Sequence, residues 1–201
     1  MSHLHFTSTE VYRKRVIQMG ENPSKVYNSG APGLDNIYKL KLKNKKELFD
    51  KLSLKTNDKY FLITFHPVTL EKDTAEIYID ELLNALGEFP DYKLIFTMPN
   101  ADTDGRIIYQ KIHKYFSDYP SKGGLFKSLG QLNYLSALKY SSLVIGNSSS
   151  GLIEAPSFRV PTINIGNRQK RRIKAESVIN CDTNKASIVN AINVALSNDF
   201  L

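Results

Sequence analysis

From about residue 58 onward, short apolar runs alternate with segments of helical periodicity, and this alternation constrains the fold more than any other feature. Apolar runs of strand length occupy residues 60–65, 92–96, 124–127, 143–145, 161–165 and 178–181. Apolar side chains recur at helical spacing in residues 71–86, 105–115, 130–140 and 185–197. Strands that alternate with helices of this length predict βαβ units, and therefore an α/β fold with a parallel sheet.

The first 36 residues follow a different pattern. Residues 9–19 predict a helix and residues 26–28 a strand, and Gly30-Ala-Pro-Gly33 then breaks the chain. We interpret this segment as the last helix and strand of a preceding domain, followed by a hinge, in a truncated protein. On this interpretation residues 1–35 are the remnant and hinge, and residues 36–201 form the next domain.

The chain carries a formal net charge of +7, from 27 lysines and arginines against 20 acidic residues. This excess suits an anionic partner, for which nucleic acid and a nucleotide sugar are both candidates. One basic cluster, residues 39–51, opens with eight residues that lack an aromatic side chain for base stacking, and we interpret it as a solvated linker. The second cluster, residues 168–174, follows a predicted strand.

Two sequence patterns bear on where the protein is located in the cell, namely the length of its apolar runs and the character of its first residues. No apolar run approaches the roughly 20 residues of a membrane-spanning helix, and the first residues resemble no secretory signal. We therefore expect a cytoplasmic protein without a membrane contact. The single cysteine, Cys181, cannot form an internal disulfide, and we expect a buried core thiol.

The candidate site lies in the segments that follow the predicted strands, because ligands of parallel sheets bind at the carboxyl ends of the strands. These segments are residues 66–69, 98–106, 128–130, 146–151 and 166–172. All five are rich in small, polar or cationic residues, which predicts a ligand site at this edge.

The most informative of these loops is Gly146-Asn-Ser-Ser-Ser-Gly151. Its small residues allow the backbone to approach a ligand, and a helix predicted to begin near Ser149 would present free N–H groups and a positive dipole end. Such a site suits a diphosphate. An ordinary helix N-cap after a turn has the same local pattern, but the four other polar loops favour the anion site.

Several side chains near this loop leave two interpretations open. Glu154 either accepts hydrogen bonds from the vicinal hydroxyls of a ribose or is a surface charge. His66 either contacts phosphate or transfers a proton, or it is structural. Four cations follow the fifth strand, Arg168, Lys170, Arg171 and Arg172. We expect one or two of them to reach phosphate oxygens and the rest to be solvated. The other histidines have no metal-site spacing, and we expect neither a metal nor a cofactor.

A family resemblance covers nearly the whole chain. Residues 146–158, 160–166, 168–170 and 175–179 resemble the hydrolysing UDP-N-acetylglucosamine 2-epimerases, which make N-acetylmannosamine for sialic acid or related bacterial surface sugars. Similar motifs stand at residues 64–71, 96–100, 2–10 and 12–15. The resemblance implies two Rossmann-like domains with the active site between them, as in a large glycosyltransferase class. This chain would supply the end of the first domain and nearly all of the second, carboxyl-terminal one, a doubly wound parallel sheet.

The resemblance also implies roles for residues at the nucleoside end of the ligand. Ser128 and its neighbours would hold the uracil, with Tyr134 close to the base. Glu154 would hold the ribose hydroxyls. Asn100 and Arg106 would lie in the loop that lines the cleft.

At the phosphate end, the resemblance implies that Ser148 and Ser149 donate to the diphosphate and that Arg168 adds a cation. His66 would meet phosphate near the reaction centre, and it is the one catalytic residue expected in this chain. These residues imply UDP-N-acetylglucosamine and UDP as ligands, without nucleic acid.

Three residues depart from the family pattern. Arg159 and Arg171 stand where glycine is usual, and Asn167 stands where aspartate is common. Arg171 leaves the choice of phosphate-binding arginine open between Arg168 and Arg172. Arg159 is expected on a surface turn.

The reaction that the resemblance implies is elimination of UDP to a 2-acetamidoglucal, followed by addition of water with inversion at C2. The family's acid and base carboxylates belong to the first domain, and neither Asp102 nor Asp104 is a candidate to replace them. We therefore expect this chain to bind UDP weakly without turnover, and the full-length protein to be a homo-oligomer. The alternatives are a nucleotide-sugar glycosyltransferase and a non-catalytic module that binds nucleotides or nucleic acid; the serine-loop and Arg-Gln-Lys motifs argue against the glycosyltransferase.

Overall fold

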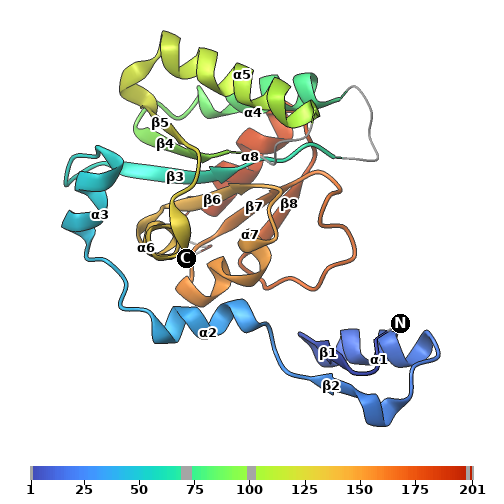
Figure 1. Ribbon diagram of the computed structural model, residues 1–201. Helices are drawn as coiled ribbons and strands as arrows, with labels where there is room; N and C mark the ends of the chain where they lie inside the picture. The colour runs from blue at the N-terminus through green and yellow to red at the C-terminus, as the bar shows by residue number, and fades with distance from the viewer. Residues whose placement is uncertain (1, 69–73, 99–102, 198–199, 201) are drawn as a thin grey trace. The chain divides into compact units, whose positions relative to one another are not determined.

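A strand with consecutive apolar residues has to be covered on both faces, and this requirement organises residues 42–201. Tyr60, Phe61, Leu62 and Ile63 are fully buried in the central strand β3 (Lys59–Thr64). The other strands of the sheet are β4 (Tyr92–Thr97), β5 (Gly123–Phe126), β6 (Leu143–Gly146), β7 (Thr162–Ile165) and β8 (Val178–Cys181). The computed structural model describes residues 2–68, 74–98, 103–197 and 200, and it orders the six strands β5-β4-β3-β6-β7-β8 (Figure 1). All neighbouring strands are parallel, as predicted.

Helices cover both faces of this sheet (Figure 1). One face is covered by α4 (Ala75–Leu86), α5 (Thr103–Asp118) and α8 (Lys185–Ala195), whose apolar side chains form one core cluster with Phe61 and Ile63. The other face carries α3 (Lys45–Leu52), α6 (Gly130–Tyr140), the short α7 (Ser150–Ile153) and a 3-10 turn, η3 (Ala155–Phe158). A second 3-10 turn, η2 (Pro120–Lys122), precedes β5. The fold is therefore a doubly wound, Rossmann-like α/β sheet.

The lysine-rich segment 39–51 is not a solvated linker throughout, and that prediction is wrong for its second half. Helix α3 begins there with a capping box in which the side chains of Asn44 and Glu47 each accept from the other's backbone N–H. Leu48, Phe49 and Leu52 are buried against the sheet. The lysines occupy the outer side of the helix, which hides its apolar face from a reading based on charge.

Residues 1–41 form a compact unit of their own, which we call the first unit, and residues 42–201 form the second unit. Strands β1 (His5–Thr7) and β2 (Val26–Asn28) pair in parallel, and α1 (Glu10–Gln18) connects them, followed by the 3-10 turn η1 (Pro23–Lys25). Helix α2 (Pro32–Lys39) begins within the predicted break, because proline suits the first turn of a helix. The chain divides after Lys41, and the assignment of the first unit to a preceding domain stays a prediction.

Two single-residue expectations concern the surface and the core. Arg159 is exposed and ends η3 in the left-handed conformation with φ 55°, so it lies on a surface turn as predicted. Cys181 is only partly buried, but burial and then the neighbouring Asp182 charge raise the pKa of its thiol to about 12. Such a thiol is unreactive at neutral pH. Within the described ranges, no helix is long and apolar enough to cross a membrane.

Candidate functional site

The strand-end cavity, as we call it, is a hollow of about 360 Å³ at the carboxyl ends of β3 and β4 and beside the loops after β5 and β6. The chain runs outward from β3 to β5 and then returns to place β6 beside β3, so this is the point where the strand order reverses. Ligands of doubly wound sheets bind at such a point. The cavity is lined by Thr64, Thr97, Met98, Lys127, Ser128, Leu129, Gly130, Gln131, Tyr134, Ser148 and Ser150.

This one cavity is lined by three predicted UDP-binding residues, Ser128, Tyr134 and Ser148. They come from the loop after β5, from α6 and from the loop after β6, which the sheet brings together at its carboxyl edge. The cavity walls are rich in hydroxyl groups. Tyr134 Oη donates to Ser150 Oγ at 2.8 Å, and the Oγ1 atoms of Thr64 and Thr97 lie 2.6 Å apart. Lys127 is the one charged residue among the described lining residues. A polar, nearly uncharged wall suits a nucleoside better than a bare polyanion.

Glu154 follows α7 directly and is only partly exposed. Its Oε2 is buried and has no hydrogen-bond partner among the residues that the structure describes. Burial, and to a smaller extent the charge of Glu154, raises the pKa of Tyr134, which places the carboxylate close to the cavity wall. A buried acceptor without a partner costs at least about 1–3 kcal/mol. This environment favours a carboxylate that accepts from ligand hydroxyls over a solvated surface charge.

The serine loop, residues 146–151, leads into a helix shorter than the sequence suggested. Helix α7 has four residues, so its macrodipole is small, and an anion site here has to rest on individual N–H groups. In the described part of the chain, the backbone N–H groups of Ser148 and Ser149 have no hydrogen-bond partner, whereas those of Gly151 and Leu152 donate back to Ser148 O and Ser149 O. Two free donors thus stand next to each other on the loop.

Close packing against the sheet requires glycine at both ends of the serine loop, a requirement that the sequence does not reveal. Gly146 has φ 135°, and a Cβ atom there would stand 2.0 Å from the carbonyl oxygen of Thr64. A Cβ atom on Gly151 would stand 2.7 Å from Thr162 Cγ2. The missing side chains therefore let the loop lie against β3 and β7, rather than only against a ligand.

Asn147 is the residue that the sequence analysis missed. Its side chain is 1% exposed, and it bonds the backbone of His66 twice: Oδ1 accepts from the His66 N–H at 2.7 Å, and Nδ2 donates to the His66 carbonyl at 2.7 Å. The Asn147 carbonyl in turn accepts from Arg168 Nη1 at 3.0 Å and from Gln169 Nε2 at 2.7 Å. Asn147 therefore ties together the loops that follow β3, β6 and β7. Because the Asn147 side chain bonds main-chain groups, which every residue type has, its partner cannot be identified from the sequence.

These bonds place two more predicted residues. His66 is partly buried, and its backbone is fixed beside the serine loop. Arg168 is held at the same loop by its bond to Asn147, whereas Arg171 and Arg172 line a different cavity. The geometry thus favours Arg168 among the three candidate arginines.

Two further predicted residues, Arg106 and Ser149, do not line the strand-end cavity. Arg106 lies in the first turns of α5, exposed, and not in a loop. Ser149 adjoins Ser148 but does not line the cavity. Asn100 and Asp102 lie outside the described residues. Among the described residues, no group of three or more histidine, cysteine, aspartate or glutamate side chains could hold a metal ion.

A doubly wound sheet with a polar cavity and a serine loop at the reversal point is typical of nucleotide-binding α/β domains. The family of UDP-N-acetylglucosamine 2-epimerases matches residues 1–200, and the chain belongs to this family. This confirms the resemblance seen in the sequence.

Individual relatives agree with this assignment. The chain is 45% identical to the polysialic acid biosynthesis protein P7 of Escherichia coli. This match covers the whole of the chain and 51% of the relative. It is 41% identical to the hydrolysing GDP/UDP-N,N'-diacetylbacillosamine 2-epimerase of Campylobacter jejuni. This match covers 92% of the chain and 48% of the relative. The chain therefore spans about half the length of the curated relatives it matches.

A solved structure confirms the fold. The UDP-N-acetylglucosamine 2-epimerase of Methanocaldococcus jannaschii, in complex with UDP-N-acetylglucosamine and UDP, superposes with a TM-score of 0.75 at 17% identity. The match covers the whole of this chain and 56% of the archaeal one.

Proposed function

We propose that this chain is the UDP-binding, carboxyl-terminal portion of a hydrolysing UDP-N-acetylglucosamine 2-epimerase. The observation that carries the proposal is the strand-end cavity, where Ser128, Tyr134 and Ser148 meet, together with the unpartnered carboxylate oxygen of Glu154, a residue whose charge acts on Tyr134. Family membership supports it, as does the hydrolysing 2-epimerase named among the relatives. In this proposal the chain acts in the cytoplasm as part of a longer, oligomeric protein.

The proposed ligand lies across the reversal point of the sheet. The uracil is held by the loop after β5, at Ser128, with Tyr134 next to the base. The ribose hydroxyls donate to Glu154, which satisfies its buried oxygen. The diphosphate accepts from the N–H groups of Ser148 and Ser149.

The phosphate end is the leaving group of the reaction. Removal of the C2 proton and departure of UDP give a 2-acetamidoglucal, and water then adds to release N-acetylmannosamine. Negative charge grows on the diphosphate as the C1–O bond breaks, and preorganised donors stabilise that charge. The loop N–H groups and Arg168 supply the donors, and His66 lies at the reacting end. The acid and base carboxylates belong to the other half of the enzyme, so this chain alone binds UDP without turnover.

Calorimetric titration of the chain with UDP and with ADP, at two salt concentrations, tests the binding proposal. We expect weak binding that prefers UDP, because the base pocket is built from specific polar groups rather than from charge. Glu154→Gln should lower UDP affinity about tenfold, since a neutral amide accepts from the ribose hydroxyls less strongly than a carboxylate. The matched control is Glu176→Gln, at an exposed glutamate outside the strand-end cavity. Equal affinity for UDP and ADP would contradict the proposal.

Product assays separate the alternatives. The chain should release no N-acetylmannosamine from UDP-N-acetylglucosamine, and robust release would overturn the claim that it lacks catalytic groups. Sugar transfer that depends on an added acceptor would instead indicate a glycosyltransferase. Tight RNA or DNA binding with a steep salt dependence, and without a preference for UDP, would indicate a nucleic-acid-binding module.

A further inference from the structure

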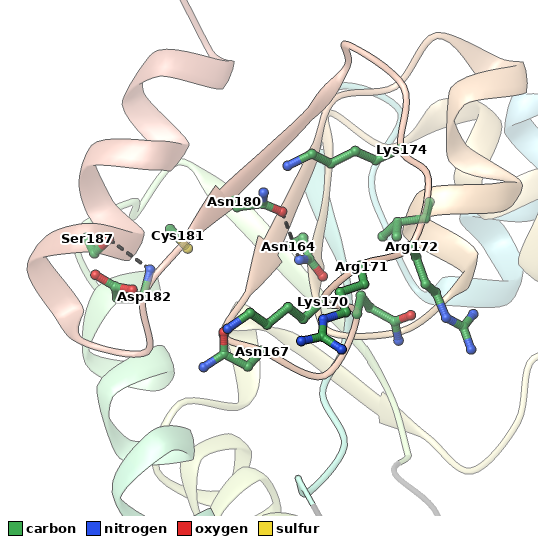
Figure 2. Close-up of a pocket in the computed structure, with 13 residues that line it drawn as sticks. Asn164, Asn167, Lys170, Arg171, Arg172, Lys174, Asn180, Cys181, Asp182 and Ser187 are labelled. Carbon is green, nitrogen blue, oxygen red and sulfur yellow. Dashed lines mark hydrogen bonds between the residues drawn. The ribbon is translucent and has the colours of Figure 1, made fainter. Parts of the chain in front are cut away.

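A second hollow, which we call the basic cavity, lies beside β7 and β8 and shares no lining residue with the strand-end cavity (Figure 2). Its volume is about 580 Å³, within the usual range for small-molecule sites. The contact between Gln169 and Asn147 stands between the two hollows, because Gln169 lines the basic cavity while Asn147 belongs to the serine loop. The proposed UDP site therefore does not account for this cavity.

The charge of the basic cavity is one-sided. Among the described residues, four cations line it, Lys170, Arg171, Arg172 and Lys174, against the single carboxylate of Asp182. In the residues described, no salt bridge joins Lys170, Arg172 or Lys174 to an acidic side chain. Like charges held on one short loop repel each other, and an anion between them would relieve that repulsion.

The inner wall of the basic cavity is made of amides. Asn164 and Gln169 are each only 5% exposed. Asn164 Nδ2 donates to Asn180 Oδ1 at 3.0 Å, a bond visible in Figure 2, and Gln169 Nε2 donates to Asn147. Their oxygens, Asn164 Oδ1 and Gln169 Oε1, are buried and have no partner among the described residues. Buried acceptors without partners indicate a missing donor, such as a hydroxyl group.

These two features indicate one class of ligand. Cations at the rim require a negative charge, and amide oxygens at the wall require hydroxyl or N–H donors. Both amide oxygens are buried within the wall, so a ligand would reach them only after side chains of the wall shift, and the exposed lysine and arginine side chains at the rim are free to do so. We propose that the basic cavity binds a small anion that also carries hydroxyl groups, of the sugar-phosphate class. The phosphate lies among Lys170, Arg172 and Lys174, and the hydroxyls donate to Asn164 and Gln169.

Calorimetric titration of the 201-residue chain with glucose 1-phosphate tests this inference, with inorganic phosphate and glucose as component probes. The titration is made in the presence of excess UDP, which occupies the strand-end cavity if the proposed function is right. We expect glucose 1-phosphate to bind at least about tenfold more tightly than inorganic phosphate, because the amide wall adds contacts to the sugar. Glucose alone should not bind measurably.

Variants assign the binding to the basic cavity. The triple variant K170A/R172A/K174A should lower the affinity for glucose 1-phosphate more than about tenfold and leave UDP affinity unchanged. The variant Asn164→Leu should weaken glucose 1-phosphate but not inorganic phosphate. A matched control, K55A/K59A/K114A, removes three exposed lysines elsewhere in the second unit and should have no effect. Thermal melts confirm that each variant is folded.

Three results would overturn the inference. Displacement of glucose 1-phosphate by UDP, with affinities that K170A/R172A/K174A leaves unchanged, would show that both occupy the strand-end cavity. An equal loss in the control triple variant would show diffuse charge attraction. An oligonucleotide that binds the cavity more tightly, with a steep salt dependence, would make it part of a nucleic-acid surface. If UDP fails to bind while glucose 1-phosphate binds and responds to the variants, the proposed function fails and this inference stands.

Discussion

The two units of the chain contain the same local motif at very different depths of burial. The segment β1–α1–β2 in residues 1–41 is a parallel βαβ unit, as is β3–α4–β4 in residues 42–201. Strand β3 is buried from Tyr60 to Thr64, whereas helices α1 and α2 contain no buried residue. In the first unit, Phe6 and Tyr27 stack on each other and are still 67% and 48% exposed.

This difference shows what local sequence can and cannot do. Local capping interactions and turns define the helices and strands of the first unit. For example, the Thr9 side chain caps the start of α1. Stability requires further layers, and two strands with one helix cannot cover their own faces. The relatives are about twice as long as this chain. We infer that the first unit belongs to a sheet completed by the part of the protein that this chain does not span.

Loss of a glycine should have the largest effect, and only in the second unit. Gly146→Ala places a Cβ atom against the carbonyl of Thr64 and should lower the free energy of unfolding by about 4 kcal/mol or more. Gly20→Ala, also at positive φ but with open space around it, should cost only about 1–2 kcal/mol and leave the second unit intact. Urea denaturation followed by circular dichroism measures both. Equal midpoints for the two variants would contradict the packing argument.

Core truncation should separate the two units next. Leu82→Ala removes a fully buried side chain of α4 and should cost about 2–5 kcal/mol. Val11→Ala, at a position of α1 that is 45% exposed, should change the free energy of unfolding by less than about 0.5 kcal/mol. The same denaturation experiment compares them. A large loss from Val11→Ala would mean that the first unit has a core of its own.

Removal of the Asn147 amide should affect both stability and binding. Asn147→Ala leaves the N–H and carbonyl groups of His66 without these partners, which should cost about 2–3 kcal/mol. UDP affinity should fall as well, because the loop after β3, which carries His66, loses its side-chain tie to the serine loop. The control Asn193→Ala lies on the exposed side of α8. If UDP affinity is unchanged while stability falls, Asn147 supports the fold but not the site.

A gain of stability is expected at one turn. Arg159 holds a left-handed conformation that glycine adopts without strain, so Arg159→Gly should raise the free energy of unfolding of the second unit by about 1 kcal/mol. Arg159→Ala should give no gain, because alanine is strained there too. A thermal melt that shows the same midpoint for all three proteins would mean that the turn is held by other contacts.

The smallest effect should follow the largest deletion. Residues 42–201 without the first unit should unfold with a free energy within about 0.5 kcal/mol of the whole chain, because the second unit has its own core. Urea denaturation of the two proteins tests this. A loss above about 1 kcal/mol would show that the first unit stabilises the second, so that the two units would not differ in this way.

The sequence predicted the sheet well because its strands are continuous apolar runs. It missed β1, which has only three residues, α2, which begins within the predicted break, and α3, whose lysines hide Leu48 and Leu52. The capping box at Asn44 and Glu47 was a usable signal for α3.

The candidate site was predicted in part. The rule that ligands bind at strand ends, together with the family resemblance, named Ser128, Tyr134 and Ser148, which line one cavity, and their contact with UDP stays a prediction. Neither could find Asn147, because its partners are backbone groups about 80 residues away, a separation that only the fold closes. The orientation of the basic loop was equally hidden, since a run of cations does not say which of them faces the serine loop.

The strand order also has a consequence for synthesis on the ribosome. Strand β3 pairs with β6, so the edge of β3 that faces β6 stays open until the chain has grown by a further 80 residues or so. At about 5–20 residues per second, that interval is about 4–16 s. During this time β3, β4 and β5 can associate only as a sheet with an apolar, unpaired border, a surface that favours contact with other nascent chains. Rapid elongation between β3 and β6, or a chaperone that covers the border, would limit such contacts.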